Sequence, residues 1–157
     1  MALEFSAAAR EKVEQIRAKY PTDCAALLPA LYVAQEEFGH VSLEAMEYVA
    51  GLLNVSPATV YGVATFYTMY NKAPVGKYLV QVCMNLPCAL RGAEEVFEYI
   101  SKKLGAKAGE TTKDGRFTLM KVECLGACGA APMMQVNDKY YEDLTPAKVD
   151  DILGGMK

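Results

Sequence analysis

Apolar side chains recur at helical spacing through the first 70 residues, where four stripes each predict one helix. The first two stripes consist of Val13, Ile16 and Tyr20, and of Leu27, Leu28, Leu31 and Phe38. Pro29 lies inside the second stripe, so we expect that helix to begin late or to kink there. The last two stripes consist of Leu43, Met46, Ala50 and Leu53, and of Val60, Val63, Ala64 and Tyr67. Ser42 and Ser56 are candidate N-caps for them, and Pro57 suits the first helical position.

The pattern changes after residue 70. A segment rich in proline and glycine, residues 71–76, predicts a linker. The elements expected beyond it are strands at 78–82, 117–122, 133–136 and 139–141, a helix at 91–104, a polar loop at 105–115, a turn at Asn137–Asp138 and a last helix capped by Thr145 and Pro146. The order β-α-β-β-β-α is typical of a small α/β layer structure. We therefore expect an α+β protein with a helical bundle in residues 1–72 and an α/β domain in residues 73–157.

Size and charge narrow the class of protein. With 157 residues and 52% apolar composition, one domain, or a small domain plus a helical extension, can bury a core. The net charge of −3 gives no general attraction to nucleic acid or to anionic membrane. The start, MALEFSAAAREKVEQ, has no continuous apolar region, so we expect no secretory signal. No run of 18 apolar residues occurs, so we expect no direct membrane insertion.

Five cysteines without a secretion signal indicate a reducing compartment, where closely spaced cysteines more often bind metal or do redox chemistry than form structural disulfides. His40 is the single histidine, which excludes a three-histidine zinc site and a Rieske centre. Cys24 stands apart within a helical stripe, and we expect it to be a buried free thiol.

The other four cysteines form the pattern Cys83-x4-Cys88 and Cys124-x3-Cys128, with each pair expected in a loop after a predicted strand. Four thiolates are the ligand set that a [2Fe–2S] cluster requires. Small residues beside the second pair would let backbone N–H groups approach the sulfurs: Gly126, Ala127, Gly129, Ala130 and Ala131. An apolar wall is available from Met84, Leu86, Pro87, Leu125 and Met133, although ordinary loop packing explains these residues equally well.

Three other functions compete with electron transfer. A structural zinc-binding interaction module also uses four cysteines, but the x4 and x3 spacings favour iron–sulfur. Two redox-active disulfides are less favoured because neither pair is Cys-x-x-Cys.

Residues 43–70 have a sequence pattern similar to that of a DNA-binding helix-turn-helix. However, no charged residue lies between Pro57 and Asn71, and residues 1–72 hold five Lys or Arg against eight Asp or Glu, which disfavours DNA. The aromatic residues of segment 43–70 indicate core packing or, if several are exposed together, a protein partner. They are Tyr61, Phe66, Tyr67 and Tyr70.

The chain resembles the thioredoxin-like [2Fe–2S] ferredoxin family, which provides a subunit of NADH–quinone oxidoreductase (respiratory complex I). The stretches that carry the resemblance are VATFYTMYNKAPVGKYLVQVC, PCALRG, GETTKDGRFTLMKVECLGACGAAPM and VNDKYYEDLTP, and the helical segment before them also fits. The Cys-x4-Cys pair with ECLGAC is the most specific part, and it matches at every ligand position.

The resemblance implies a helical bundle followed by a thioredoxin-like domain that holds the cluster on Cys83, Cys88, Cys124 and Cys128. It implies a partner, the flavin-bearing, NADH-oxidising subunit, which would carry FMN and NADH, and the large iron–sulfur subunit as a second partner. The chain would then act as a subunit of an enzyme, without a complete active site of its own. It would lie in the cytoplasm, peripheral on the inner face of the membrane, or on the matrix side in an organelle. Relatives also serve NAD-linked hydrogenases and formate dehydrogenases, and GKYLVQVC and VNDKYYEDLT favour the respiratory host.

Overall fold

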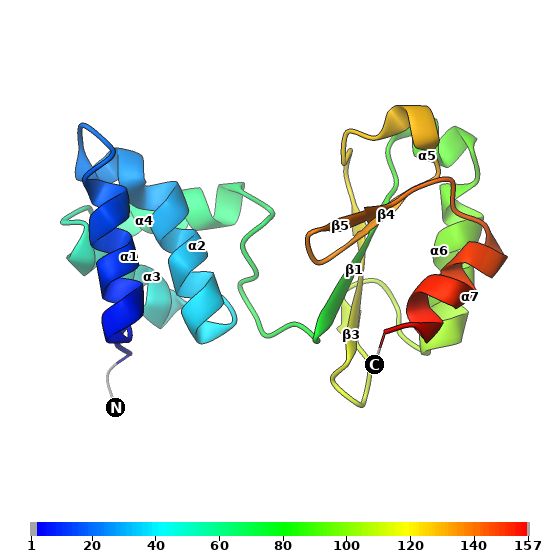
Figure 1. Ribbon diagram of the computed structural model, residues 1–157, viewed down its shortest axis with the longest axis horizontal. Coiled ribbons are helices and arrows are strands. Elements are labelled where there is room, and N and C mark those ends of the chain that lie inside the picture. The colour runs from blue at the N-terminus through cyan, green and yellow to red at the C-terminus, as the bar shows by residue number, and fades with distance from the viewer. Residues whose placement is uncertain (1–2, 157) are drawn as a thin grey trace. The chain divides into compact units, whose positions relative to one another are not determined.

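A computed structural model describes residues 3–156 and divides the chain into two compact units, with the boundary between Pro74 and Val75 (Figure 1). This boundary falls inside the segment 71–76, where proline and glycine predict a linker. The protein combines helices with one five-stranded sheet, so the predicted α+β class is confirmed. Among the described residues, no helix is long and apolar enough to cross a membrane.

The first unit is helical. Its elements are α1 (Ala7–Arg17), a short 3-10 helix η1 (Asp23–Ala26), α2 (Leu27–Phe38), α3 (Leu43–Leu52) and α4 (Pro57–Phe66). Both predicted N-caps are confirmed, because the Ser42 hydroxyl accepts from the Ala45 amide at 3.1 Å and the Ser56 hydroxyl from the Thr59 amide at 3.1 Å. Pro57 is the first residue of α4.

Two prolines explain where the first two helices end and begin. The predicted stripe through Tyr20 is wrong at its end: α1 stops at Arg17 and Tyr20 is exposed, because Pro21 disfavours helical backbone in the residue before it. Pro29 lies in the first turn of α2, where a missing N–H breaks no intrahelical bond. The helix therefore begins just before its proline.

Most residues of the predicted apolar stripes form the core of this unit, but the prediction is wrong at Leu43, which is exposed at the first position of α3. Val13, Leu31, Leu53 and Val60 are fully buried. Tyr70 is buried as well, and its hydroxyl donates to the Leu28 carbonyl at 2.8 Å. Burial raises the pKa of the Tyr70 phenol, so it stays a neutral donor. This bond fixes the chain that leaves α4 against α2.

The second unit is a sheet with helices. Its elements are β1 (Tyr78–Cys83), α5 (Leu86–Leu90), α6 (Ala93–Leu104), β2 (Glu110–Thr111), β3 (Phe117–Val122), the 3-10 helix η2 (Cys128–Ala130), β4 (Met134–Val136), β5 (Lys139–Tyr141) and α7 (Pro146–Gly154). Thr145 caps α7 through the Lys148 amide, and Asn137 and Asp138 form the tight turn between β4 and β5, as predicted.

The sheet has the strand order β2-β3-β1-β4-β5, in which β1 and β3 are parallel and the other pairs antiparallel. Both α6 and α7 lie on one side of it (Figure 1). Val80 and Val82 of β1 and Leu119 of β3 are buried against Ile100 of α6 and Val149 of α7 within one core. The parallel pair matters most for the site, because its two carboxyl ends meet at one edge of the sheet.

One α-helix and one strand were not predicted, and neither were the two 3-10 helices η1 and η2. The helix α5 lies in what the sequence indicated as a loop, and the two-residue strand β2 lies inside the predicted polar loop 105–115. The predicted boundaries also shift slightly, since α6 begins at Ala93 instead of Arg91 and β4 begins at Met134 instead of Met133.

Candidate functional site

The sheet brings the two cysteine pairs to the same edge. Cys83 is the last residue of β1 and pairs with Val122, the last residue of β3, two residues before Cys124. Cys88 lies in α5, and Cys128 is the first residue of η2. The expectation that both pairs lie in loops is therefore wrong for the first pair, which occupies a strand end and a helix, and for Cys128 of the second pair, whereas Cys124 lies in a loop.

The helix α5 forms because Asn85 starts it. The Asn85 side-chain oxygen accepts from the Leu86 amide at 2.9 Å, and its carbonyl accepts from the Ala89 amide at 2.9 Å. Pro87 falls in the first turn, where its missing N–H costs no bond. The turn points Cys88 inward, so that this residue is only 1% exposed.

The four thiols lie as two pairs that face one another. The sulfurs of Cys124 and Cys128 are 4.0 Å apart, and Cys83 and Cys88 are buried together in one small cluster. Cys128 in turn lies close enough to Cys83 for the two to interact electrostatically. Two thiolates on one tetrahedral metal lie ~3.8 Å apart when each metal–sulfur bond is about 2.3 Å. Cys124 and Cys128 therefore have the spacing to hold one metal of a two-metal group, and Cys83 and Cys88 lie together in one buried cluster as the second pair.

No three Cys, His, Asp or Glu side chains within residues 3–156 surround a single point in the way that one metal ion requires. The four thiols are therefore arranged as two pairs, and not as four ligands around one metal ion. A [2Fe–2S] cluster takes two thiolates on each iron, and this matches two facing pairs.

The electrostatics of the site favour a bound cation. Burial raises the pKa of the Cys88 thiol, and the neighbouring Cys83 raises it further, while the Met133 backbone amide acts in the opposite direction. The hydrogen bond with Cys124 raises the pKa of Cys128. Four thiolates this close repel one another, so a positive centre between them relieves the repulsion. Thiolates are also the soft ligands that hold iron in iron–sulfur clusters, so the donor set fits iron.

Hydrogen bonds fasten the loop that carries the second pair. The Gly126 amide donates to the Cys124 sulfur at 3.4 Å, which agrees with the expectation that a small residue brings an N–H to a sulfur. The Tyr140 hydroxyl donates to the Leu125 carbonyl at 2.6 Å. The Asn85 side-chain amide donates to the Glu123 carboxylate at 3.0 Å and so links the two cysteine segments. Neither Asn85 nor Tyr140 was predicted to support the site, although Tyr140 lies inside the stretch VNDKYYEDLTP.

A small apolar cluster surrounds the first pair. Met133 is fully buried beside Cys83 and Cys88, and Met84 and Leu125 pack against this cluster. The predicted wall is wrong at Leu86, which is 67% exposed because it faces outward from the first turn of α5. Pro87 is half-buried. Ala93 and Ala131, which complete the cluster, were not predicted as wall residues.

Cys24 lies apart from these residues. It belongs to η1 in the helical unit and is exposed, so the expectation of a buried thiol is wrong. The reason is local: the 3-10 helix turns Ala26 into the core, followed by Leu27 of α2, and leaves the Cys24 side chain outside.

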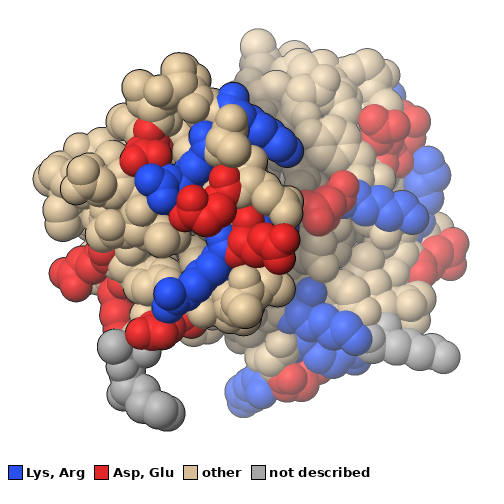
Figure 2. Space-filling view, turned by 60° about the vertical axis from the view of Figure 1, so that its left-hand side comes forward, with Lys and Arg blue, Asp and Glu red and all other residues tan. Residues whose placement is uncertain are grey.

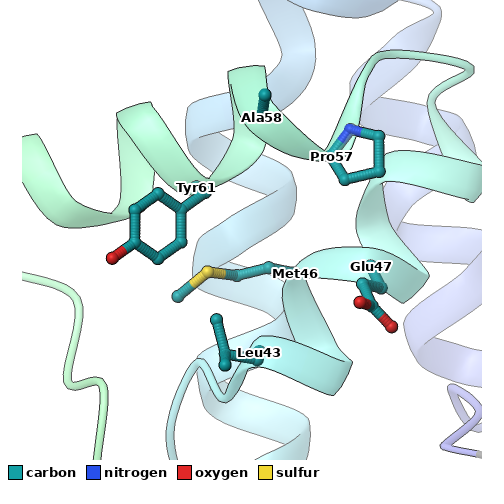
Figure 3. A pocket seen from close by; sticks show the side chains of 6 residues that line it. All are labelled: Leu43, Met46, Glu47, Pro57, Ala58 and Tyr61. Atoms are coloured by element: carbon teal, nitrogen blue, oxygen red, sulfur yellow. The ribbon is translucent and has the colours of Figure 1, made fainter.

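A second feature is an apolar groove on the helical unit, with a volume of about 310 Å³ (Figure 3). Its lining consists of Leu43, Met46, Glu47, Pro57, Ala58 and Tyr61, from α3 and α4. Leu43, Tyr61 and Phe66 are 65%, 52% and 75% exposed, whereas Tyr70 is buried and Tyr67 half-buried. The aromatic residues of this segment are thus divided between the core and the surface.

Charge on the helical unit is mixed. Figure 2 turns this unit towards the viewer and shows acidic and basic side chains side by side. Several are paired, as in Lys12 with Glu36 and Arg17 with Asp23. Because nucleic acid requires a basic surface, this face does not favour the helix-turn-helix alternative.

Comparison with known proteins gives consistent results. The family model described as thioredoxin-like [2Fe-2S] ferredoxin matches residues 13–157. The chain is 49% identical over 149 residues to NADH dehydrogenase [ubiquinone] flavoprotein 2, mitochondrial, of Dictyostelium discoideum, which covers 93% of this chain but only 60% of that protein. It is 45% identical over 148 residues to a subunit of the NADH-quinone oxidoreductase of Rhizobium meliloti, which covers 94% of this chain and 88% of that protein.

Among solved structures, a crystal structure of an NAD+-reducing [NiFe]-hydrogenase in the air-oxidized state is similar, with a TM-score of 0.71 and 19% sequence identity. The match covers 83% of this chain and 22% of the hydrogenase chain, and at this identity it shows the fold alone. The family match and the two relatives confirm the predicted resemblance and the predicted [2Fe–2S] cofactor. The chain therefore belongs to the thioredoxin-like [2Fe–2S] ferredoxin family.

Proposed function

We propose that Cys83, Cys88, Cys124 and Cys128 hold one [2Fe–2S] cluster, and that the chain is the electron-transfer subunit beside the flavin-bearing, NADH-oxidising subunit of an NADH–quinone oxidoreductase. The observation that supports this most strongly is the convergence of the two thiol pairs at one edge of a sheet, in a chain that the [2Fe–2S] family model matches over residues 13–157.

When bound, the cluster supplies a centre that accepts and releases single electrons. The chain's own residues hold it and shape its surroundings. Met133 and Met84 keep water from the first pair of thiols, and the Gly126 amide donates to the Cys124 sulfur. Such surroundings set the reduction potential of an iron–sulfur group. NADH and FMN belong to the partner in this proposal, so the chain contributes to an oxidoreductase without a complete active site of its own.

The host complex follows from the relatives. Those at 45% and 49% identity carry the names of NADH dehydrogenase subunits, whereas the hydrogenase at 19% shares the fold. This difference favours the respiratory host over a hydrogenase or a formate dehydrogenase. A zinc-binding interaction module is not favoured, because the matching family is defined by an iron–sulfur cluster.

Exposed apolar residues on each unit support a protein partner. On the second unit, Leu86 and Leu90 of α5 are 67% and 78% exposed, in the helix that carries Cys88. On the first unit, Leu43 and Tyr61 line the groove of α3 and α4, and Phe66 of α4 is also exposed. Large exposed apolar side chains beside a redox centre are typical of a docking surface. In this proposal the flavoprotein subunit docks on these surfaces, and the large iron–sulfur subunit is a second partner. The whole complex is peripheral to the inner face of the membrane.

The function is tested by NADH reduction with and without the partner. We expect the isolated, reconstituted chain to show no reduction of its cluster by NADH, because no dinucleotide-binding glycine motif occurs in the sequence. Addition of the flavoprotein subunit should give reduction, measured by bleaching of visible absorption and by the electron paramagnetic resonance signal. Reduction by NADH without flavoprotein, or no reduction with it, would contradict the proposal.

A further inference from the structure

The peptide group between Leu125 and Gly126 is hydrogen-bonded at both of its ends. Its carbonyl oxygen accepts from the Tyr140 hydroxyl at 2.6 Å, and its N–H donates to the Cys124 sulfur at 3.4 Å. One peptide plane therefore connects a tyrosine of β5 with a proposed cluster ligand. Because the peptide is planar, the orientation of its carbonyl fixes the orientation of its N–H.

Packing holds Leu125, on one side of this peptide, against the apolar cluster, but it does not hold Gly126 on the other side. Gly126 has φ +86° and, without a side chain, it can adopt many backbone conformations. A Cβ placed there would meet no atom within 4 Å, so packing does not hold the residue. The orientation of the peptide thus depends on its hydrogen bonds, and the bond from Tyr140 is the short one.

Tyr140 itself is held by the sheet. It pairs with Gln135 of β4, and β4 pairs in turn with β1, which ends at Cys83. Strand pairing therefore fixes the backbone of Tyr140 relative to the end of β1. From there its half-exposed side chain reaches the Leu125 carbonyl, next to Cys124.

We propose that Tyr140 is a positioning residue that holds the Leu125–Gly126 peptide with its N–H towards the Cys124 thiolate, and thereby raises the reduction potential of the cluster. A hydrogen bond to a ligand sulfur stabilises the reduced, more negative form more than the oxidised form. A donor on the carbonyl also polarises the peptide and strengthens its N–H as a donor. The inference rests on the proposed ligand set.

Tyr140→Phe removes only the hydroxyl, and Tyr141→Phe is the matched control on the opposite face of the same strand. The full-length chain and both variants are reconstituted with iron and sulfide, and midpoint potentials are measured by redox titration with electron paramagnetic resonance. We expect Tyr140→Phe to make one-electron reduction two- to tenfold less favourable, the upper figure being ~59 mV. Tyr141→Phe should stay at the potential of the natural protein.

Pulsed electron paramagnetic resonance gives a second measurement. The coupling of a backbone nitrogen to the cluster should weaken in Tyr140→Phe and remain in Tyr141→Phe. Equal potentials and equal nitrogen couplings in the two variants would overturn the positioning role. A natural chain that binds no iron would instead overturn the proposed ligand set, so the two failures are distinguishable.

If Tyr140→Phe alone fails to hold iron, 3-fluorotyrosine at position 140 keeps both the shape and the hydroxyl. Fluorine makes the hydroxyl a stronger donor, so the potential should rise above that of the natural protein. The same analogue at position 141 should leave it unchanged. An unchanged or lower potential with the analogue at position 140 would contradict the inference.

Discussion

Among single residues, burial divides the four proposed ligands into two kinds. Cys83 and Cys88 are 3% and 1% exposed, whereas Cys124 and Cys128 are exposed. The first pair is enclosed by the chain's own apolar residues, and the second pair lies on the side that a partner can reach. An electron carrier needs both properties, since one end of the site must be dry and the other accessible.

Gly76 makes a close approach that only glycine permits. A Cβ there would lie 2.9 Å from backbone atoms of Arg116 and Phe117, and the Gly76 amide donates to the buried Thr118 hydroxyl at 2.6 Å. Since backbone atoms cannot move aside cheaply, Gly76→Ala should lower the free energy of unfolding by about 1–3 kcal/mol, measured by urea titration.

Gly154→Ala is the matched control for this prediction. Gly154 closes α7 in the same unit, and a Cβ there meets nothing within 4 Å. Alanine should be neutral or stabilise by up to about 1 kcal/mol, because it favours helical backbone. If both variants change the free energy of unfolding equally, the close approach of the backbone at position 76 is not what excludes a side chain there.

Among the elements, those with a clear period or cap were predictable from the sequence. The helices α3, α4 and α7 begin at the predicted caps, and β1 and β3 lie where strand-forming residues cluster. By contrast, α5 has five residues and includes a proline, and β2 has two residues with both side chains exposed. Segments this short show no period, so only their hydrogen bonds define them.

The site was predictable to a similar degree. The spacing of Cys83, Cys88, Cys124 and Cys128 indicated the proposed ligand set, because ligand types and spacing are local properties of the chain. The roles of Asn85 and Tyr140 depend on hydrogen bonds to residues 38 and 15 positions away. The exposure of Cys24 likewise depends on how η1 turns, which the apolar stripe did not reveal.

Asp150 of α7 connects this helix to α6. It accepts from the Lys103 ammonium at 2.7 Å and from the Tyr99 hydroxyl at 2.8 Å. The Lys103 hydrogen bond, followed by that from Tyr99, lowers the pKa of Asp150 below 3.8. A lowered folded pKa stabilises the protein above the unfolded value, and the stabilisation is lost as the pH falls through the folded pKa.

Asp150→Asn should therefore destabilise the protein at pH 6, and the difference from the natural chain should disappear as the pH falls below 3.8. Urea unfolding at a series of pH values measures this. Asp151→Asn removes an equal charge one residue along α7 and serves as control. A difference between Asp150→Asn and the natural chain that persists undiminished in acid would rule out the ionised carboxylate as the cause.

At the scale of the whole molecule, the chain consists of two units with separate cores. The proposed ligands all lie in the second unit, and their supporting hydrogen bonds come from that unit as well. We therefore predict that residues 73–157, expressed alone under anaerobic conditions with iron and sulfide, hold a cluster. If the full chain holds iron and this fragment never does, the helical unit is required and the independent-domain proposal is wrong.

The most direct test of the account is the iron and acid-labile sulfide content of five variants in the full-length chain, with Cys24, Cys83, Cys88, Cys124 and Cys128 each replaced by alanine. The natural protein and Cys24→Ala should contain about two irons and about two sulfides per chain and should give an electron paramagnetic resonance signal after reduction. Each of the other four variants should lose most of both, because one iron is left without a thiolate. Full iron and sulfide in Cys83→Ala, together with their loss in Cys24→Ala, would contradict the proposed ligand set. A colourless natural protein that contains zinc would contradict the proposed cluster.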